Sequence, residues 1–232
     1  DLGARHLHVT GNLKFDVTPS RELIERGRKW RAASGERSVL LAASTRDGEE
    51  ALLLDALSLL PADVLLVLVP RHPQRFDSVA RLIEQRRLAY LRRTEDRAPA
   101  RETRVLLGDS MGEMPAYYAA CDLAFVGGSL LPYGGQNLIE ACTIGSPVVI
   151  GPHTYNFAEP ARGAIESGAA VRVEDAAGLM RTAAALLNDR ARRMDMARCA
   201  LEFSRAYRGA TERVMAIITA PATDSPQPDR SR

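Results

Sequence analysis

Several features that mark particular classes of protein are scarce in this sequence. Only 5% of the residues are aromatic and the formal net charge is +2, so neither stacking side chains nor positive charge indicates a nucleic-acid partner. Lysine is rare: of 31 lysines and arginines, only Lys14 and Lys29 are lysines. The three cysteines, Cys121, Cys142 and Cys199, have no CxxC spacing, which favours free thiols in a reducing compartment.

Other signatures are missing altogether. The most apolar region, residues 51–69, is interrupted by two aspartates and a proline, so no membrane span is predicted, and no signal peptide is visible. No GxxxxGK[ST] motif is present and no GxGxxG opens a helix, which disfavours P-loop and dinucleotide-binding proteins. His6 and His8 lack the cysteines or carboxylates that would complete a metal site. Because the chain opens at Asp1, inside a segment with a strand pattern, we expect it to be a fragment.

What is present is an alternation of short apolar runs and amphipathic stretches, in a chain with 46% hydrophobic and 26% charged residues. Strands are predicted at 6–10, 39–43, 64–69, 89–91, 105–107, 123–126, 148–150 and 170–173. Helices are predicted at 21–33, 49–60, 74–85, 114–120, 137–144, 158–167, 176–187 and 190–218. Continuous apolar strands separated by helices predict an α/β domain with a Rossmann-like, doubly wound parallel sheet. We expect this domain to occupy residues 1–218, followed by a disordered, proline-containing tail at 219–232.

The most informative stretch is residues 126–152, VGGSLLPYGGQNLIEACTIGSPVVIGP, which carries two glycine pairs between a strand and a helix. Glycines allow close approach of backbone N–H groups to a ligand, and a helix N-terminus favours an anion. The helix is expected to start near Gln136 and to end at Gly145, so that Asn137 and Glu140 share one face. Glu140 would then be placed to bind a ribose diol. An ordinary turn with a solvated Glu140 fits the same residues.

Polar residues and glycines also follow four other predicted strands, at 11–16, 44–50, 70–73 and 108–113. The ends of parallel strands meet at one edge of a sheet, so these loops predict a binding cleft. Arg71 is either a surface residue or a cation for a phosphate, and Lys14 is either an exposed lysine or a charge aimed at an anion. Ser44 and Thr45 are expected to cap the helix that follows, with Asp47, Glu49 and Glu50 stabilising its N-terminus.

Six segments in order, GNLKFD, STRDGEE, PRHPQRF, GDSMGEM, GGSLLPYGGQNLIEA and GPHTYNF, resemble the carboxy-terminal half of bacterial Kdo transferases. These enzymes add 3-deoxy-D-manno-octulosonic acid to the lipid A precursor. The resemblance covers about residues 2–189. It implies the carboxy-terminal Rossmann-like domain of a GT-B glycosyltransferase, which holds the donor CMP-Kdo. It also implies inverting transfer without a required metal or cofactor, with the general base in an amino-terminal domain outside this sequence.

The resemblance further implies that Glu140 binds the ribose, and that Arg71 and the backbone around Gly135 to Asn137 bind the phosphate. The residues expected to contact the donor are Lys14, Thr45, Arg46, Pro70, Arg71, His72, Met111, Gly112, Glu113, Gly134, Gly135, Gln136, Asn137, Leu138, Ile139 and Glu140. The sequence departs from the family at three of these positions. Gln136 replaces a histidine, Leu138 replaces a proline, and Arg46 replaces a histidine common in the family. Any proton transfer assigned to the histidine that Gln136 replaces is therefore in doubt.

The expected partners are CMP-Kdo or CMP and, through the amino-terminal domain, the lipid A precursor at the cytoplasmic face of the bacterial inner membrane. By itself, this chain is expected to stay in solution, to bind CMP weakly and not to transfer sugar. Two alternatives remain open. One is another GT-B nucleotide-sugar enzyme, such as a UDP-sugar epimerase, and the other is a non-enzymatic nucleotide-binding module.

Overall fold

A computed structural model describes residues 7–11, 13–16 and 18–219, which fall into two units. The described residues of the main unit are 18–206, and those of the smaller unit are 7–11, 13–16 and 207–219. The single domain expected over 1–218 stays a prediction, and the two units are described separately. The expected tail at 219–232 lies, apart from Thr219, outside the described residues.

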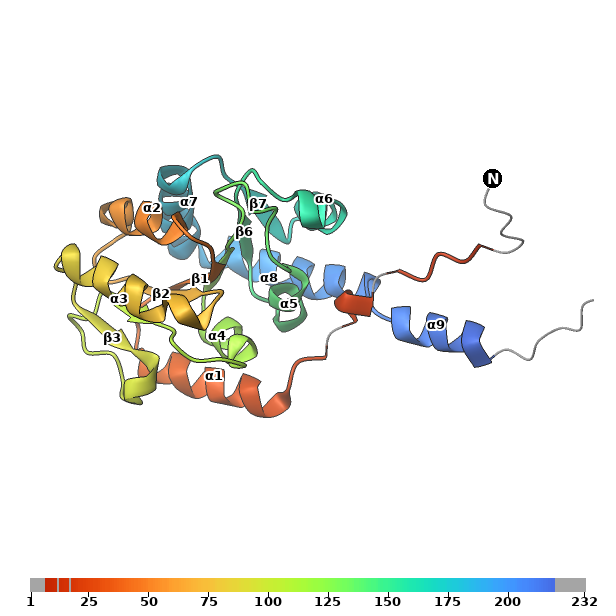
Figure 1. Cartoon of the computed structure of the whole chain (residues 1–232), viewed down its shortest axis with the longest axis horizontal. Helices are drawn as coiled ribbons and strands as arrows, with labels where there is room; N and C mark the ends of the chain where they lie inside the picture. The colour runs from red at the N-terminus through yellow and green to blue at the C-terminus, as the bar shows by residue number, and fades with distance from the viewer. Residues whose placement is uncertain (1–6, 12, 17, 220–232) are drawn as a thin grey trace, which may run out of the picture. The chain divides into compact units, whose positions relative to one another are not determined.

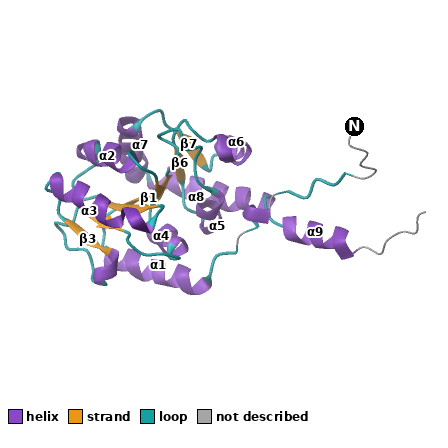
Figure 2. Ribbon diagram, viewed as in Figure 1, coloured by secondary structure: helices purple, strands orange, loops and turns teal. Residues whose placement is uncertain are grey.

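The main unit contains a seven-stranded sheet in the order β3-β4-β2-β1-β5-β6-β7, in which all printed strand pairs are parallel (Figures 1 and 2). The strands are β1 (Val39–Thr45), β2 (Leu65–Pro70), β3 (Tyr90–Arg92), β4 (Val105–Leu107), β5 (Leu123–Val126), β6 (Val148–Ile150) and β7 (Ala170–Arg172). The central strands β1, β2 and β5 are buried almost throughout, as their apolar sequences predict. The doubly wound α/β architecture is confirmed.

Helices cover both faces of this sheet, as Figure 1 shows for α2 and α7 on one side and α1 and α4 on the other. The helices of the main unit are α1 (Arg21–Ala33), α2 (Glu49–Asp55), α3 (Phe76–Gln85), α4 (Met114–Ala120), α5 (Ile139–Ile144), α6 (Ala158–Glu166), α7 (Ala176–Asn188) and α8 (Arg190–Ala206). Four short 3₁₀ helices join them: η2 (Leu57–Leu59), η3 (Pro73–Arg75), η4 (Arg93–Glu95) and η5 (Tyr155–Phe157). Helices α1 and α4 cross closely, since a Cβ added at Gly27 would lie 2.2 Å from the carbonyl oxygen of Ala116.

Four predicted elements differ in the structure. The helix expected at 49–60 ends at Asp55 and is followed by the separate 3₁₀ helix η2. The helix expected at 190–218 is interrupted at Gly209, whose φ of 85° is left-handed, and continues as α9 (Ala210–Thr219). The strand expected at 6–10 does not form over residues 7–10, where Leu7 and Val9 are 88% and 89% exposed and pair with no described strand. The helix expected from 137 begins at Ile139, although its end at Gly145 is confirmed by that residue's φ of 80°.

The smaller unit contains η1 (Leu13–Phe15) and α9. Asp16 joins them, because its carboxylate accepts hydrogen bonds from the backbone N–H groups of Gly209 and Thr211 at 3.2 and 3.0 Å. The apolar side chains of Met215, Ile217 and Ile218 in α9 are exposed. None of the described helices combines the length and apolar composition that spanning a membrane requires.

Candidate functional site

Four of the five loops predicted to converge do so. Strands β4, β2, β1 and β5 are neighbours in the sheet and parallel, so the loops that follow them lie along one edge. The fifth loop, at 11–16, belongs to the smaller unit. Lys14 lies there in η1, and its side chain is outside the described parts of the chain, so its role stays a prediction.

A buried carboxylate joins the β1 loop to the β5 loop. Glu49 is 0% exposed and accepts four backbone hydrogen bonds. Its Oε2 accepts from the N–H groups of Arg46 and Gly128 at 2.8 and 2.6 Å, and its Oε1 from those of Ser129 and Leu130 at 3.0 and 2.9 Å. Burial raises the pKa of Glu49, and the bonds from the backbone oppose this rise. The N–H of Gly127 donates to the carbonyl of Ala43 at 2.8 Å, so both N–H groups of the first glycine pair donate within the protein.

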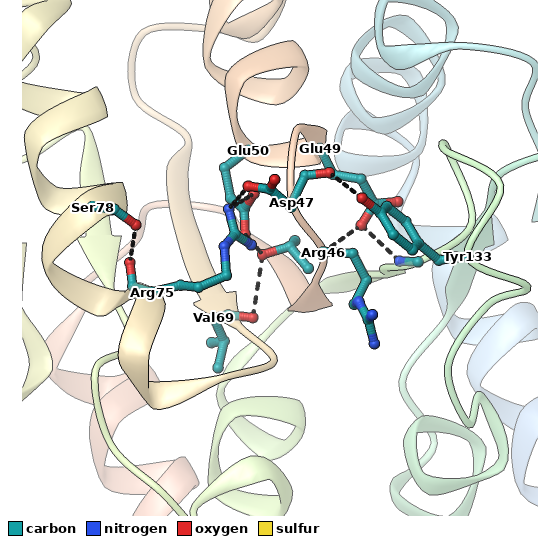
Figure 3. Close-up of polar contacts among 10 residues, drawn as sticks. Arg46, Asp47, Glu49, Glu50, Val69, Arg75, Ser78 and Tyr133 are labelled. Atoms are coloured by element: carbon teal, nitrogen blue, oxygen red, sulfur yellow. Dashed lines mark hydrogen bonds and ion pairs between the residues drawn. The ribbon is translucent and has the colours of Figure 1, made fainter.

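The adjacent carboxylate, Glu50, joins the β1 loop to the segment after β2. Glu50 is also 0% exposed, and it accepts a bidentate pair of hydrogen bonds from Arg75 at 2.6 and 2.9 Å and a third from Thr45 Oγ1 at 2.7 Å. Arg75 is further paired with Asp47 at 2.9 Å. Figure 3 shows how Glu49 and Glu50 point in different directions from the start of α2 to hold two different loops.

These contacts correct the expectation for residues 44–50. Thr45 does not cap a helix, because its hydroxyl donates to Glu50 and its side chain is buried, and the residue at the N-cap of α2 is Gly48. Glu49 and Glu50 do lie in the first turn of α2, but as buried acceptors rather than as solvated charges near the helix dipole. The left-handed conformation of Gly48, with a φ of 85°, turns the chain so that both side chains enter the interior.

The second glycine pair folds back on the first. The N–H of Gly135 donates to the carbonyl of Gly128 at 2.6 Å, and Gly134 and Gly135 both have positive φ. The backbone N–H groups of Gln136 and Asn137 donate no hydrogen bond within the described part of the chain. An incoming anion therefore finds donors at Gln136 and Asn137 but not at Gly135.

Asn137 and Glu140 lie together at the start of α5, as predicted. The side-chain oxygen of Asn137 accepts from the N–H of Ile139 at 3.1 Å, and its amide nitrogen donates to Glu140 at 3.3 Å. Glu140 is half-buried; burial raises the pKa of this carboxyl, and the bond from Asn137 and the charge of Arg71 act against the rise. A half-buried carboxylate with one oxygen oriented by an amide can accept further hydrogen bonds from a ligand.

Positive groups gather at the same edge. Arg71 is exposed after Pro70, at the end of β2, and Arg46 lies at the end of β1. The pKa of His72 is lowered by burial and then by the charges of Arg46, Arg71 and Arg75. The positive charge at this edge is therefore supplied by arginine side chains.

The remaining predicted site residues differ in how they are placed. Met111 is 59% exposed beside Gly112, whereas Glu113 is bound by Arg26 at 2.7 Å and by Arg93 at 3.4 Å. The side chains of Leu138 and Ile139 are 1% and 0% exposed, so only their backbone is available to a ligand. Their contacts with the donor stay predictions.

Sequence reasoning missed the roles of Glu49, Glu50, Arg75 and Tyr133 at this edge. The available signal was the acidic pair that opens EEALLL, an otherwise apolar helix start. A separate hollow of about 690 Å³ lies near the ends of β6 and β7 and is lined in part by His153, Thr154 and Arg172, but by none of the predicted site residues. Among the described residues, no three His, Cys, Asp or Glu side chains are grouped to hold a metal ion.

The fold and the loops gathered at its edge define a Rossmann-like α/β domain of the kind that binds ligands at the carboxyl ends of its strands. Residues 51–202 match the family model described as glycosyl transferases group 1, and the chain belongs to this family.

Among curated proteins, the chain is 47% identical to 3-deoxy-D-manno-octulosonic acid transferase of Bordetella pertussis over 92% of this chain and 51% of that protein. It is 37% identical to the Haemophilus influenzae transferase of the same name, over 91% of this chain and 51% of that protein. The resemblance to Kdo transferases is confirmed, and the chain spans about half the length of these relatives.

Among solved structures, the C-terminal CMP-Kdo binding domain of WaaA from Acinetobacter baumannii superposes with a TM-score of 0.75 at 30% identity, covering 79% of this chain and 98% of that one. Anabaena HepE in complex with UDP and glucose has a TM-score of 0.63 at 21% identity, covering 89% of this chain and 53% of that one. This second similarity shows the fold alone.

Proposed function

We propose that this chain binds CMP-Kdo and belongs to an enzyme that transfers Kdo from it to the lipid A precursor in lipopolysaccharide core biosynthesis. The observation that carries the proposal is the match to a CMP-Kdo binding domain over 98% of that domain's length. The 47% identity to a named Kdo transferase supports it. The alternatives of a UDP-sugar epimerase or a non-enzymatic module have no comparable support.

In this proposal the phosphate lies between Arg71 and the backbone N–H groups of Gln136 and Asn137. Those N–H groups have no other acceptor within the described residues, and Arg71 is exposed and near enough to Glu140 for its charge to act against the rise that burial causes in the pKa of that carboxyl. Glu140 accepts hydrogen bonds from the ribose hydroxyls, a role supported by its half-buried position and its bond from Asn137. The exposed Met111–Gly112 turn and the loop of Pro70 and His72 are assigned to the base.

The reaction would be an inverting displacement at the anomeric carbon of Kdo. The acceptor hydroxyl loses its proton to a general base and bonds to that carbon, the bond from the carbon to the phosphate oxygen breaks, and CMP leaves. This chain contributes by fixing the donor and by placing arginine charge where the leaving phosphate gains negative charge. We place the acceptor and the general base outside these residues, and the whole enzyme at the cytoplasmic face of the inner membrane.

Isothermal titration of the chain with CMP, UMP and NAD tests the nucleotide assignment. CMP is expected to bind and UMP to bind more weakly, because a base contact distinguishes the cytosine amino group from the uracil carbonyl. Equal binding of CMP and UMP, or tight binding of NAD, would contradict the proposal.

A further inference from the structure

Arg46 is held at the site edge by a constrained backbone. Ser44, two residues earlier, has a φ of 54°, which is uncommon for a residue other than glycine, and the pairing of β1 with β2 shifts register between Ala43 and Thr45. The chain after this turn is fixed, because Thr45 is bonded to Glu50 and the N–H of Arg46 donates to Glu49. Two fully buried carboxylates thus determine where the Arg46 side chain leaves the backbone.

The guanidinium of Arg46 is also held in place. Its central carbon lies 4.8 Å from the ring centroid of Tyr133, and the hydroxyl of Tyr133 donates to the carbonyl of Asp47 at 3.1 Å. A Cβ added at Gly128 would lie 3.3 Å from Cγ of Arg46 and 3.1 Å from the side-chain nitrogen of Gln136. Arg46 therefore lies beside Gln136, the residue whose backbone N–H group we assign to the phosphate.

Among the described residues, the charge of Arg46 has no acidic partner. Of three arginines at this edge, Arg75 is neutralised by Glu50 and Asp47, while neither Arg46 nor Arg71 forms an ion pair with a described carboxylate, although the charge of Arg71 acts on Glu140. Figure 3 shows the guanidinium of Arg46 pointing away from Glu49 and Glu50, whereas that of Arg75 points at Glu50. Holding a half-buried cation without a partner costs free energy, which an anionic ligand would offset.

We propose that Arg46 binds the carboxylate of the donor sugar and so selects a sugar acid, an inference that rests on the proposed function. An ulosonic acid carries its carboxylate on the anomeric carbon, the same carbon that bears the phosphate, so its CMP derivative presents two neighbouring anions. Arg71 and Arg46 are two cations at the same edge, and neither forms an ion pair within the described part of the chain. The planar guanidinium matches a carboxylate with two parallel hydrogen bonds, which a lysine cannot form.

The test compares CMP, which lacks the sugar carboxylate, with freshly prepared CMP-Kdo, using calorimetric titration of the chain and its Arg46→Met variant. We expect the affinity for CMP to change by less than about twofold and that for CMP-Kdo to fall by about 10- to 100-fold, as for loss of a hydrogen-bonded charge pair. Arg46→Lys should recover only part of the loss. The matched control is Arg71→Met, which should weaken both ligands alike, and thermal unfolding checks that each variant is folded.

The outcomes separate this inference from the function on which it rests. If the wild-type chain binds neither CMP nor CMP-Kdo, the proposed function fails. If the wild type binds both and Arg46→Met weakens both equally, Arg46 is a phosphate ligand and the carboxylate assignment is overturned while the function stands. Unchanged binding of both ligands by Arg46→Met overturns the assignment as well.

Discussion

Replacing Glu49 by glutamine should strongly destabilise the main unit. Each carboxylate oxygen of Glu49 accepts hydrogen bonds from two backbone N–H groups, so both oxygens are needed to satisfy the four donors. A glutamine keeps one oxygen and turns an NH₂ group toward two N–H donors, which loses two charge-assisted hydrogen bonds and leaves those donors without a partner. At about 1.5–3 kcal/mol for each such bond, and with some relief because no charge is buried, we expect a loss of roughly 3–5 kcal/mol.

Urea unfolding followed by far-ultraviolet circular dichroism measures this change. The expected loss is a large part of the total of about 5–15 kcal/mol typical of a domain, so the variant should fold but unfold at a clearly lower urea concentration. Glu166→Gln is the matched control, because that carboxylate is 70% exposed and its pair with Arg162 is 4.0 Å long. A destabilisation by Glu49→Gln below about 1 kcal/mol would refute the assignment of Glu49 as the residue that holds the two loops together.

Three further predictions concern helix packing, the ribose and the histidine. Gly27→Ala should destabilise the protein by about 1–3 kcal/mol in chemical unfolding, because the new Cβ would lie 2.2 Å from a backbone oxygen of α4; a stabilised variant would show that helix propensity outweighs this contact. Glu140→Ala should weaken CMP binding by about 1.5–3 kcal/mol in calorimetry, and an unchanged affinity would place the ribose elsewhere. The pKa of His72 lies below 6.5, so the folded state binds this proton less readily than the unfolded state, and stability should fall as pH drops from 6.5 through the folded pKa. Bound CMP partly neutralises the nearby arginines and should raise the pKa of His72 in a proton NMR titration, whereas an unmoved pKa would separate His72 from the site.

The fold was predictable because its signals are local. Apolar runs such as LLVLVP become buried parallel strands, and β4, β5 and β6 form over the residues predicted for them. The strand predicted at residues 6–10 was wrong for residues 7–10, because apolar residues form a strand only where a neighbouring strand is available to pair with. The break at Gly209 was missed since the apolar periodicity continues on both sides of it.

The candidate site was predictable in part, for the same reason. The adjacency of Asn137 and Glu140 follows from their spacing of three on one chain segment, and the hydrogen bond between their side chains in the structure agrees with it. Which cations are free could not be predicted in this way. Nothing in the sequence distinguishes Arg46, Arg71 and Arg75. In the structure, only Arg75 of these three forms salt bridges with Glu50 and Asp47.

By itself, therefore, the sequence determined the strands, most helices and the loops that carry polar residues, because these depend on side-chain periodicity and on glycine positions along the chain. Only the tertiary structure decided that Glu49 and Glu50 are buried, that the backbone N–H of Gly128 donates to Glu49, and that Arg46 has no carboxylate partner among the described residues. Those outcomes depend on which loops the order β4-β2-β1-β5 brings together, and contacts between residues 80 positions apart leave no local pattern in the chain.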